Sequence, residues 1–143
     1  MPLIDPDELF DAVVAASEVL LGSAVEALAV LAPEVNLSEY RVLIILDDLG
    51  PQRLIDLAGA LGVTSTTATR FSERLVKHGL VDRVHRSADR REIHLEIVDE
   101  GRRLVRHMAK KRRQLLSSAL AELPAADQAA AVRVLARLGQ GPA

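Results

Sequence analysis

Apolar side chains recur at helical spacing along most of the chain and predict six helices. The first is expected to begin at Pro6 behind a capping Asp5 and to end before Pro33, because a proline disfavours helical backbone at the preceding residue. Ser38 and Asp99 are expected to cap the second and the fifth. After the first helix, the expected ranges are about 39–49, 53–61, 65–78, 100–122 and 126–138.

Two of these helices are short and follow each other across a turn that contains Gly62. Ala58 is small where a second helix would cross, and apolar residues occupy the expected interior positions of such a unit: Leu57, Leu61, Val63, Ala68 and Phe71. Beyond residue 79 the apolar period falls to two, which predicts short strands near 80–84 and 93–97. Two short helices followed by a hairpin indicate a winged helix-turn-helix.

The outward face of helix 65–78 carries hydroxyl groups at its start and basic groups further along. Short hydroxyl side chains allow close entry into a DNA major groove, and Arg70, Arg74 and Lys77 form one basic stripe. The alternative is that the hydroxyls only cap the helix and the basic groups are a solvated face. The candidate DNA-binding residues on this helix are Ser65, Thr66, Thr67, Thr69, Arg70, Arg74 and Lys77.

The hairpin loop is the second candidate contact. Arg86, Arg90 and Arg91 cluster there, and arginine fits a narrow, electronegative minor groove. Asp89 is expected to bond loop amides or to orient a neighbouring arginine. The alternative is a charged turn that only keeps a sheet edge soluble.

Charge is distributed unevenly along the chain. Net charge is −2, yet residues 1–63 carry eleven acidic and two basic side chains, and residues 64–143 carry nine acidic and sixteen basic ones. The two parts therefore carry −9 and +7, a polarity that the overall balance conceals.

Several classes of function are disfavoured. The chain has no cysteine, which excludes disulfides, thiolate metal sites and thiol chemistry. Its four histidines (78, 85, 94 and 107) lack the spacing of a metal site, and no catalytic arrangement or phosphate loop occurs, so neither an enzyme nor a cofactor is expected. No uninterrupted apolar run reaches 18 residues and no basic residue precedes an apolar stretch at the N-terminus, so we expect a cytoplasmic protein without a membrane span.

The fold class expected is mainly α with a small β-hairpin wing. Residues 37–98 would form the winged helix-turn-helix lobe, and residues 1–36 with 99–143 a helical dimerisation region. The first and last helices carry more apolar surface than one lobe can cover, which favours a homodimer.

The motifs resemble the MarR family of bacterial transcriptional regulators. The resemblance rests on Leu37–Leu43, Leu57–Val63, Thr69-Arg70, Arg74-Leu75, Gly79-Leu80-Val81, Asp89-Arg90-Arg91 and Asp99-Glu100-Gly101, and covers about residues 37–108. It implies a homodimer that places two lobes on palindromic double-stranded DNA, regulated by a small effector that is often anionic or aromatic. It also assigns Thr66, Thr67, Thr69, Arg70 and Arg74 to the DNA-reading helix and Arg90 or Arg91 to the wing.

Three hypotheses follow. The first is a ligand-responsive DNA-binding repressor, the second a winged-helix protein-interaction module without DNA binding, and the third a metal-responsive regulator of the same fold. The basic cluster at residues 102–113 is interpreted as a solvated helix face, with an anionic-effector pocket between that helix and the lobe as the alternative.

Overall fold

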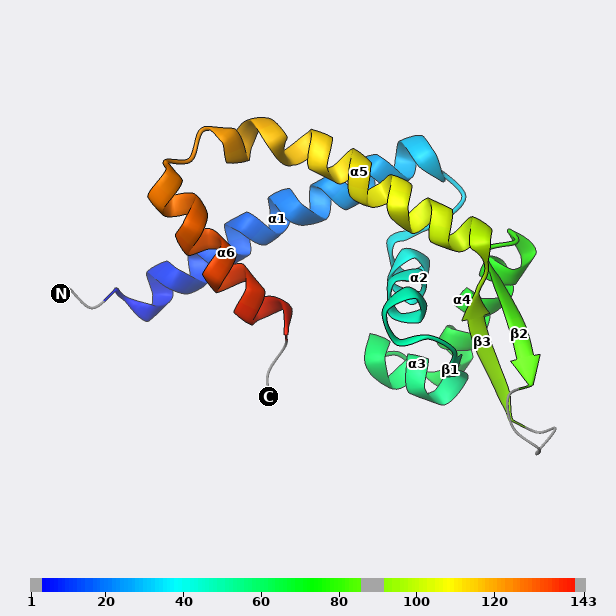
Figure 1. The fold of residues 1–143 in the computed structure, drawn as a ribbon. Coiled ribbons are helices and arrows are strands. Elements are labelled where there is room, and N and C mark those ends of the chain that lie inside the picture. The colour runs from blue at the N-terminus through cyan, green and yellow to red at the C-terminus, as the bar shows by residue number, and fades with distance from the viewer. Residues whose placement is uncertain (1–3, 86–91, 141–143) are drawn as a thin grey trace.

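The computed structural model describes residues 4–85 and 92–140. It confirms the fold class: the chain is mainly helical with a small antiparallel sheet (Figure 1). The elements are α1 (Pro6–Leu31), α2 (Leu37–Leu49), β1 (Gln52–Arg53), α3 (Leu54–Leu61), α4 (Ser65–Lys77), β2 (Val81–His85), β3 (Ile93–Ile97), α5 (Asp99–Ala121) and α6 (Ala125–Gly139).

Two helices begin differently from the prediction. Asn36, not Ser38, caps α2: its side chain accepts a hydrogen bond from the Glu39 amide at 2.9 Å, and the Glu39 carboxylate accepts one from the Asn36 amide at 3.1 Å. This reciprocal capping box satisfies two otherwise unpaired backbone donors. Asp99 lies inside the first turn of α5, and Val98 occupies the cap position without a side-chain bond. The Val98 amide instead donates to the Leu80 carbonyl at 3.2 Å, which keeps Val98 extended.

The sheet has a strand that the sequence analysis missed. β3 lies between β1 and β2, and both neighbours pair with it antiparallel. β1 contains only two residues, with Gln52 opposite Leu95 and Arg53 opposite His94. This short strand joins the start of the helix-turn-helix to the wing, so α3 and the hairpin form one lobe.

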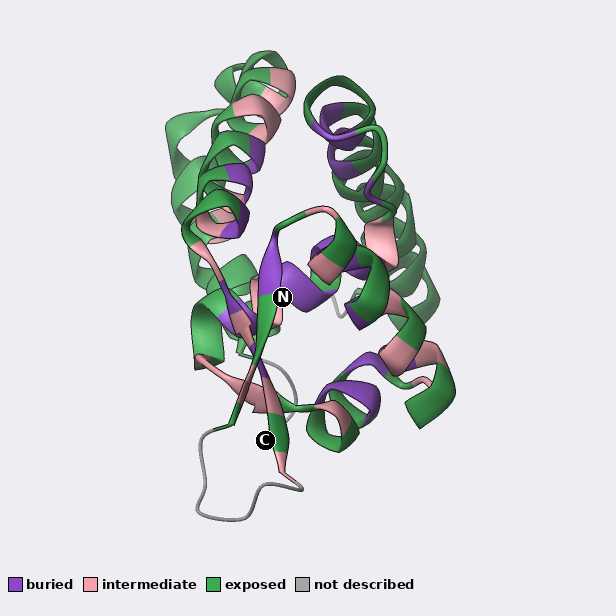
Figure 2. Cartoon of the chain, turned by 90° about the vertical axis from the view of Figure 1, so that its right-hand side faces the viewer, coloured by how far each residue is buried: buried purple, intermediate pink, exposed green. Residues whose placement is uncertain are grey.

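The core lies where α1, α2, α4, β3 and α5 meet. Leu43, Leu46, Leu75, Leu95 and Met108 are fully buried there. The buried residues gather in the lobe and on the inward sides of the two long helices above it (Figure 2). α1 and α5 extend beyond the lobe side by side, and α6 turns back from the far end of α5 (Figure 1).

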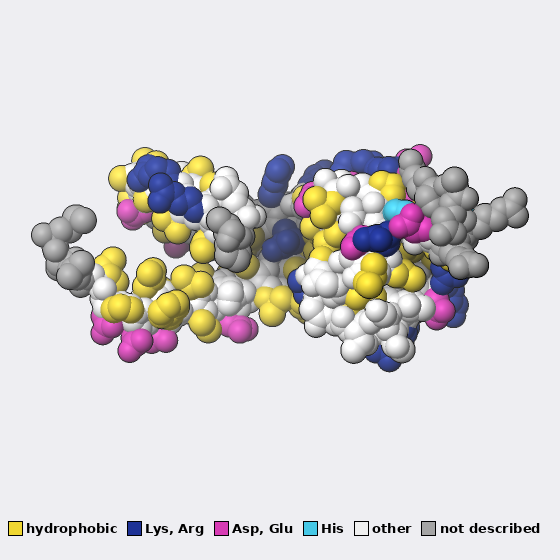
Figure 3. All heavy atoms as spheres, turned by 90° about the horizontal axis from the view of Figure 1, so that it is seen from below, with side chains coloured by type: hydrophobic (Ala, Val, Ile, Leu, Met, Phe, Trp, Pro, Cys, Tyr) yellow, Lys and Arg dark blue, Asp and Glu magenta, His cyan; other side chains and the backbone are white. Residues whose placement is uncertain are grey.

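The parts of α1 and α6 that extend beyond the lobe expose many large apolar side chains. Phe10 is 65% exposed, Val14 60%, Val132 69% and Leu135 53%. Seen from below, hydrophobic side chains line these helices on the left of Figure 3. α1 also contains an 18-residue window with mean hydropathy 1.8, so by length and composition it is apolar enough to cross a membrane. The core helix of a soluble protein and a signal sequence meet the same criterion.

Candidate nucleic-acid interface

Gly62 and Thr64 fix the start of α4. Gly62 adopts φ +68°, a left-handed conformation that glycine adopts without steric cost, and thereby ends α3. The Thr64 hydroxyl accepts a hydrogen bond from the Thr67 amide at 3.2 Å and lies 3.0 Å from the Thr67 hydroxyl. The predicted turn is therefore confirmed, and α4 starts at Ser65 as predicted.

One face of α4 is buried against the lobe and the opposite face is exposed, as the helix-turn-helix prediction requires. Ala68, Ser72 and Leu75 are buried against the lobe. Ser65, Thr66, Arg70, Arg74 and Lys77 are exposed, whereas Thr67 and Thr69 are half-buried. The Thr69 hydroxyl donates to the Ser65 carbonyl at 2.9 Å. The exposed face therefore offers hydroxyls near its N-terminus and basic groups toward its C-terminus.

Arg74 has partners within the chain that the sequence analysis did not foresee. Its Nε donates to a carboxylate oxygen of Glu39, and its second guanidinium nitrogen donates to the Glu34 carbonyl at 3.1 Å. The Glu39 side chain is completely buried, and that of Arg74 is about half exposed. Arg74 thus differs from the other basic residues predicted on this helix.

The wing loop lies outside the described residues. The structure describes the two strands that lead into it, with His85 paired to Ile93 at the last register position. The predictions for Arg86, Asp89, Arg90 and Arg91 concern residues outside the described part of the chain, and they stay predictions.

An ion-pair group lies at the base of the wing. Arg53 Nε donates to Asp56 at 2.8 Å, and its guanidinium lies 3.5 Å from a Glu92 carboxylate oxygen. The hydrogen bond from Arg53 lowers the pKa of the Asp56 carboxyl, and the same contact raises the pKa of Arg53. Nearby, His94 Nδ1 is buried and has no hydrogen-bond partner among the residues that the structure describes. The group links the start of α3 to Glu92, the residue before β3.

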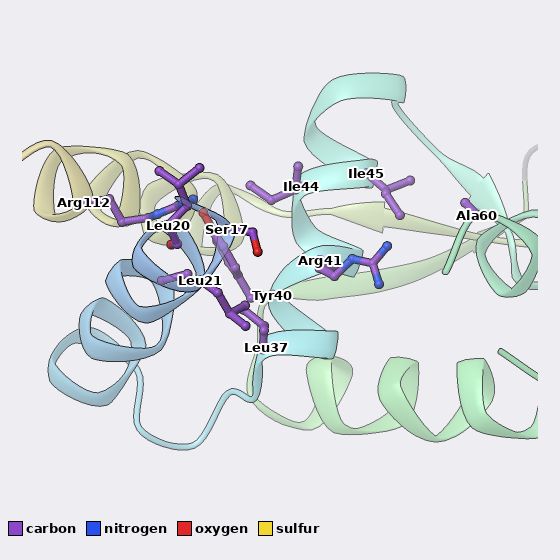
Figure 4. Close-up of a pocket in the computed structure, with 11 residues that line it drawn as sticks. Ser17, Leu20, Leu21, Leu37, Tyr40, Arg41, Ile44, Ile45, Ala60 and Arg112 are labelled. Carbon is purple, nitrogen blue, oxygen red and sulfur yellow. Dashed lines mark hydrogen bonds between the residues drawn. The ribbon is translucent and has the colours of Figure 1, made fainter. Parts of the chain in front are cut away.

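A pocket of about 660 Å³ opens between α1 and α2, with α3 and α5 at its edges. Its wall is mostly apolar, and it carries arginines from two different helices, Arg41 and Arg112 (Figure 4). Arg112 donates to the Ser23 hydroxyl at 3.1 Å and to the Leu20 carbonyl at 3.2 Å, which joins α5 to α1. The lining residues are Ser17, Leu20, Leu21, Ala24, Leu37, Tyr40, Arg41, Ile44, Ile45, Ala60 and Arg112.

The sequence analysis reached this pocket only in outline. It weighed an anionic-ligand site between the basic helix and the lobe, but it did not identify Tyr40 or Arg41 as lining residues. Tyr40 has the spacing of a core residue on α2 and is buried, whereas Arg41 is exposed. Within residues 4–85 and 92–140, no group of three or more histidine, aspartate or glutamate side chains could hold a metal ion.

This geometry defines a winged helix-turn-helix protein with long helices attached to its lobe. Comparison with known proteins indicates the same class: the model of the MarR family matches residues 35–93. Over this part the chain is similar to the MarR family.

Curated relatives agree over part of their length. The uncharacterized HTH-type transcriptional regulator YpoP of Bacillus subtilis is 28% identical over 83 residues, which cover 58% of this chain and 59% of the relative. YsmB, another such regulator of that organism, is 32% identical over 69 residues, covering 48% and 47%. The chain thus aligns with about half the length of these relatives.

Solved structures match the whole architecture. RV1404 from Mycobacterium tuberculosis has a TM-score of 0.86 and 28% identity, covering 99% of this chain and 97% of its own. A MarR family protein from Bacillus stearothermophilus has a TM-score of 0.81 and 21% identity, covering 94% and 92%. BpsR of Bordetella bronchiseptica, described with regulation of its DNA binding by 6-hydroxynicotinic acid, has a TM-score of 0.67 and 22% identity, covering 99% and 100%. At 21% and 22% identity, the similarity to the last two proteins shows a shared fold only.

Proposed function

We propose that this chain is a ligand-responsive, homodimeric DNA-binding transcriptional regulator that acts as a repressor. The observation that carries the proposal is the exposed face of α4, where hydroxyl and basic side chains occupy the second helix of a helix-turn-helix. In such motifs this helix enters the major groove of DNA with its N-terminal residues toward the base edges. A repressor of this kind occupies promoter DNA and so blocks transcription.

The contacts divide by chemistry. Ser65, Thr66 and Thr67, at the N-terminus of α4, and Thr69 one turn further on, would reach base edges or phosphates. Arg70 would contact a base edge or a phosphate from the same face, whereas Lys77 would contact a phosphate near the helix end. The 86–91 loop, with Arg86, Asp89, Arg90 and Arg91, would serve as the minor-groove wing.

We assign residues 1–36 and 99–143 to a dimerisation region and residues 37–98 to the DNA-binding lobe. Support comes from the exposed apolar side chains of α1 and α6, which lie away from the lobe (Figures 1 and 3). A second copy of the chain would cover this surface. Two recognition helices about 34 Å apart would then fit successive major grooves of a palindromic operator.

The pocket between α1 and α2 is the proposed effector site. Its apolar wall suits an aromatic ring, and Arg41 and Arg112 suit a carboxylate or another small anion. The structural likeness to BpsR, whose DNA binding is described as regulated by an aromatic acid, favours this ligand class.

We place the protein in the cytoplasm, where a regulator meets DNA. Its apolar α1 is assigned to the dimer rather than to a membrane, because Arg112 of α5 bonds to Ser23 and to the Leu20 carbonyl in the middle of that helix. Those polar contacts would be buried in lipid if α1 crossed a bilayer.

The test is a fluorescence-anisotropy titration of labelled DNA from the region upstream of the gene, against unrelated DNA, at 50 and 200 mM salt. A dimer that makes roughly 6–10 phosphate contacts should lose about 10³–10⁵ in affinity between these concentrations. Arg70→Ala should cost about 1–3 kcal/mol on the upstream DNA. Arg106→Ala, which removes an equal charge from the exposed face of α5, is the matched control and should change affinity much less.

If Arg70→Ala bound the upstream DNA with wild-type affinity, the assignment of α4 as the DNA-reading helix would be wrong. Failure of the wild type to bind any DNA at low salt would reject the regulator proposal in favour of a protein-interaction module.

A further inference from the structure

The Glu39 carboxylate is a buried charge with partners from two elements. Its side chain has no exposed surface. One carboxylate oxygen accepts the Asn36 amide at 3.1 Å and the other accepts Arg74 Nε. A buried carboxylate is costly unless hydrogen bonds and an opposite charge compensate its lost hydration. Arg74 therefore supplies the charge that makes the burial of Glu39 tolerable.

Arg74 also joins three parts of the fold. The residue belongs to α4, Glu39 lies in the first turn of α2, and Glu34 lies in the connection between α1 and α2. The guanidinium donates to the carboxylate of Glu39 and to the carbonyl of Glu34, so two donors of one planar group bond two separate acceptors. A forked donor set of this kind fixes direction as well as distance. The orientation of α4 about its own axis is thereby tied to the start of α2.

The neighbouring exposed arginine provides the contrast. Arg70 lies one turn earlier on α4 and is solvent-exposed. Arg74 donates from its Nε and from one terminal nitrogen to partners within the chain, whereas the sequence pattern places Arg70 and Arg74 in one basic stripe. If Arg74 turned its Nε to DNA, it would break its bond to Glu39 and leave that buried carboxylate without its opposite charge.

We propose that Arg74 is a positioning residue: through Glu39 and Glu34 it orients the recognition helix α4, and it makes no DNA contact of its own. This inference rests on the proposed function, since it concerns how α4 is presented to DNA. It deepens that function by separating the residues that read DNA from the residue that holds the reading helix in place.

A positioning role and a DNA-contact role for Arg74 predict different effects of one substitution, Glu39→Gln, on the affinity for DNA. Glu39→Gln keeps a side-chain oxygen for the capping box, because glutamine also serves at that position, but it removes the charge that holds Arg74. If Arg74 positions α4, Glu39→Gln weakens DNA binding although residue 39 is buried and cannot reach DNA. If Arg74 contacts a phosphate, releasing it leaves DNA binding unchanged or tightens it.

The experiment measures the affinity of the full chain for the labelled upstream duplex at four salt concentrations. Glu39→Gln and Arg74→Gln are each expected to weaken binding by about 2- to 30-fold. The double variant should bind DNA with about the same affinity as the single variant that binds less tightly, because both changes break the same link. The slope of log affinity against log salt should stay at the wild-type value in all three.

Arg70→Gln is the matched control on the same helix and should reduce the salt slope by about one if it loses a phosphate contact. Arg74→Lys supplies a second criterion: lysine keeps the charge but cannot donate from a planar fork to both acceptors, so it should not restore wild-type affinity. Thermal unfolding of each variant establishes that it is folded at the temperature of the titration.

Two results would overturn the inference: wild-type or tighter DNA binding by Glu39→Gln, or a salt slope for Arg74→Gln reduced by about one and restored in Arg74→Lys. Either result would leave the proposed function intact. A wild-type chain that binds no DNA would instead refute the proposed function and this assignment with it.

Discussion

Gly101 shows how the absence of one side chain allows two elements to pack. A Cβ atom at this position would lie 2.3 Å from the Leu80 carbonyl oxygen and 2.7 Å from Ile97 Cγ1. The first turn of α5 therefore packs directly on backbone at the start of the hairpin. The sequence marked Glu100-Gly101 as part of a family pattern, and the structure supplies its steric reason.

Gly101→Ala should accordingly destabilise the fold by about 1–3 kcal/mol, because the obstacle is backbone that cannot rotate away. Urea unfolding followed by circular dichroism measures the change. Gly59→Ala is the control: Gly59 is an exposed helical glycine with no atom within 4 Å of its would-be Cβ, so the substitution should be neutral or stabilise by up to about 1 kcal/mol. Equal stability of the two variants would show that α5 can shift without cost.

Residue-scale prediction succeeded where the cause is local. The Asp5 cap and the turn at Gly62 follow from a few adjacent residues, and the structure confirms both. The prediction of Ser38 as a cap was wrong because Asn36 forms a reciprocal pair with Glu39, although the same spacing rule could have found it. The bond between Arg74 and Glu39 was not predictable, because 35 residues separate them and only the fold brings them together.

At the scale of elements, short segments were harder to predict than long ones. The long amphipathic helices were predicted to within about two residues at most ends, because their periodicity extends over several turns. β1 has two residues, too few for any period, and it exists through its pairing with β3. The pocket was predicted only in outline, since its wall is assembled from several helices and its residues follow ordinary core spacing.

The link between α3 and the wing is electrostatic as well as hydrogen-bonded, and it predicts a pH dependence. Arg53 lowers the pKa of Asp56 below its ordinary value. The folded state therefore holds the Asp56 proton less tightly than the unfolded state does, so the pair stabilises the fold above the unfolded pKa of about 4. This contribution disappears as the pH falls through the lower, folded-state pKa.

Asp56→Asn should therefore lower the thermal midpoint slightly at neutral pH, and the difference from wild type should shrink as the pH falls from about 6 to about 3. The effect is small because the side chains of Arg53 and Asp56 are 48% and 45% exposed. Asp47→Asn removes an exposed carboxylate from α2 and serves as the control. A difference between Asp56→Asn and wild type that stays constant with pH would contradict the role given to Arg53.

At the scale of the whole molecule, the lobe and the long helices differ in how completely they are covered. The lobe has a closed aliphatic core, whereas α6 has no fully buried residue and α1 buries only four. The same helices carry exposed apolar groups such as Phe10, Val14 and Leu135. The sequence alone indicated that one lobe could not cover this surface, and the structure of the single chain leaves it exposed.

If this surface is the homodimer interface, a charged side chain introduced there should separate the two chains. Leu135→Glu should convert a species of twice the 15.5 kDa chain mass into one of the single chain mass, measured by sedimentation velocity, because a carboxylate buried in an apolar interface lacks a partner. Leu49→Glu is the matched control: Leu49 is 67% exposed but lies on α2 in the lobe, so the variant should keep the wild-type mass. The monomeric variant should also lose affinity for a palindromic duplex, because one lobe reads only one half-site. A wild-type chain that sediments at 15.5 kDa, or equal masses for the two variants, would refute this surface as the dimer interface.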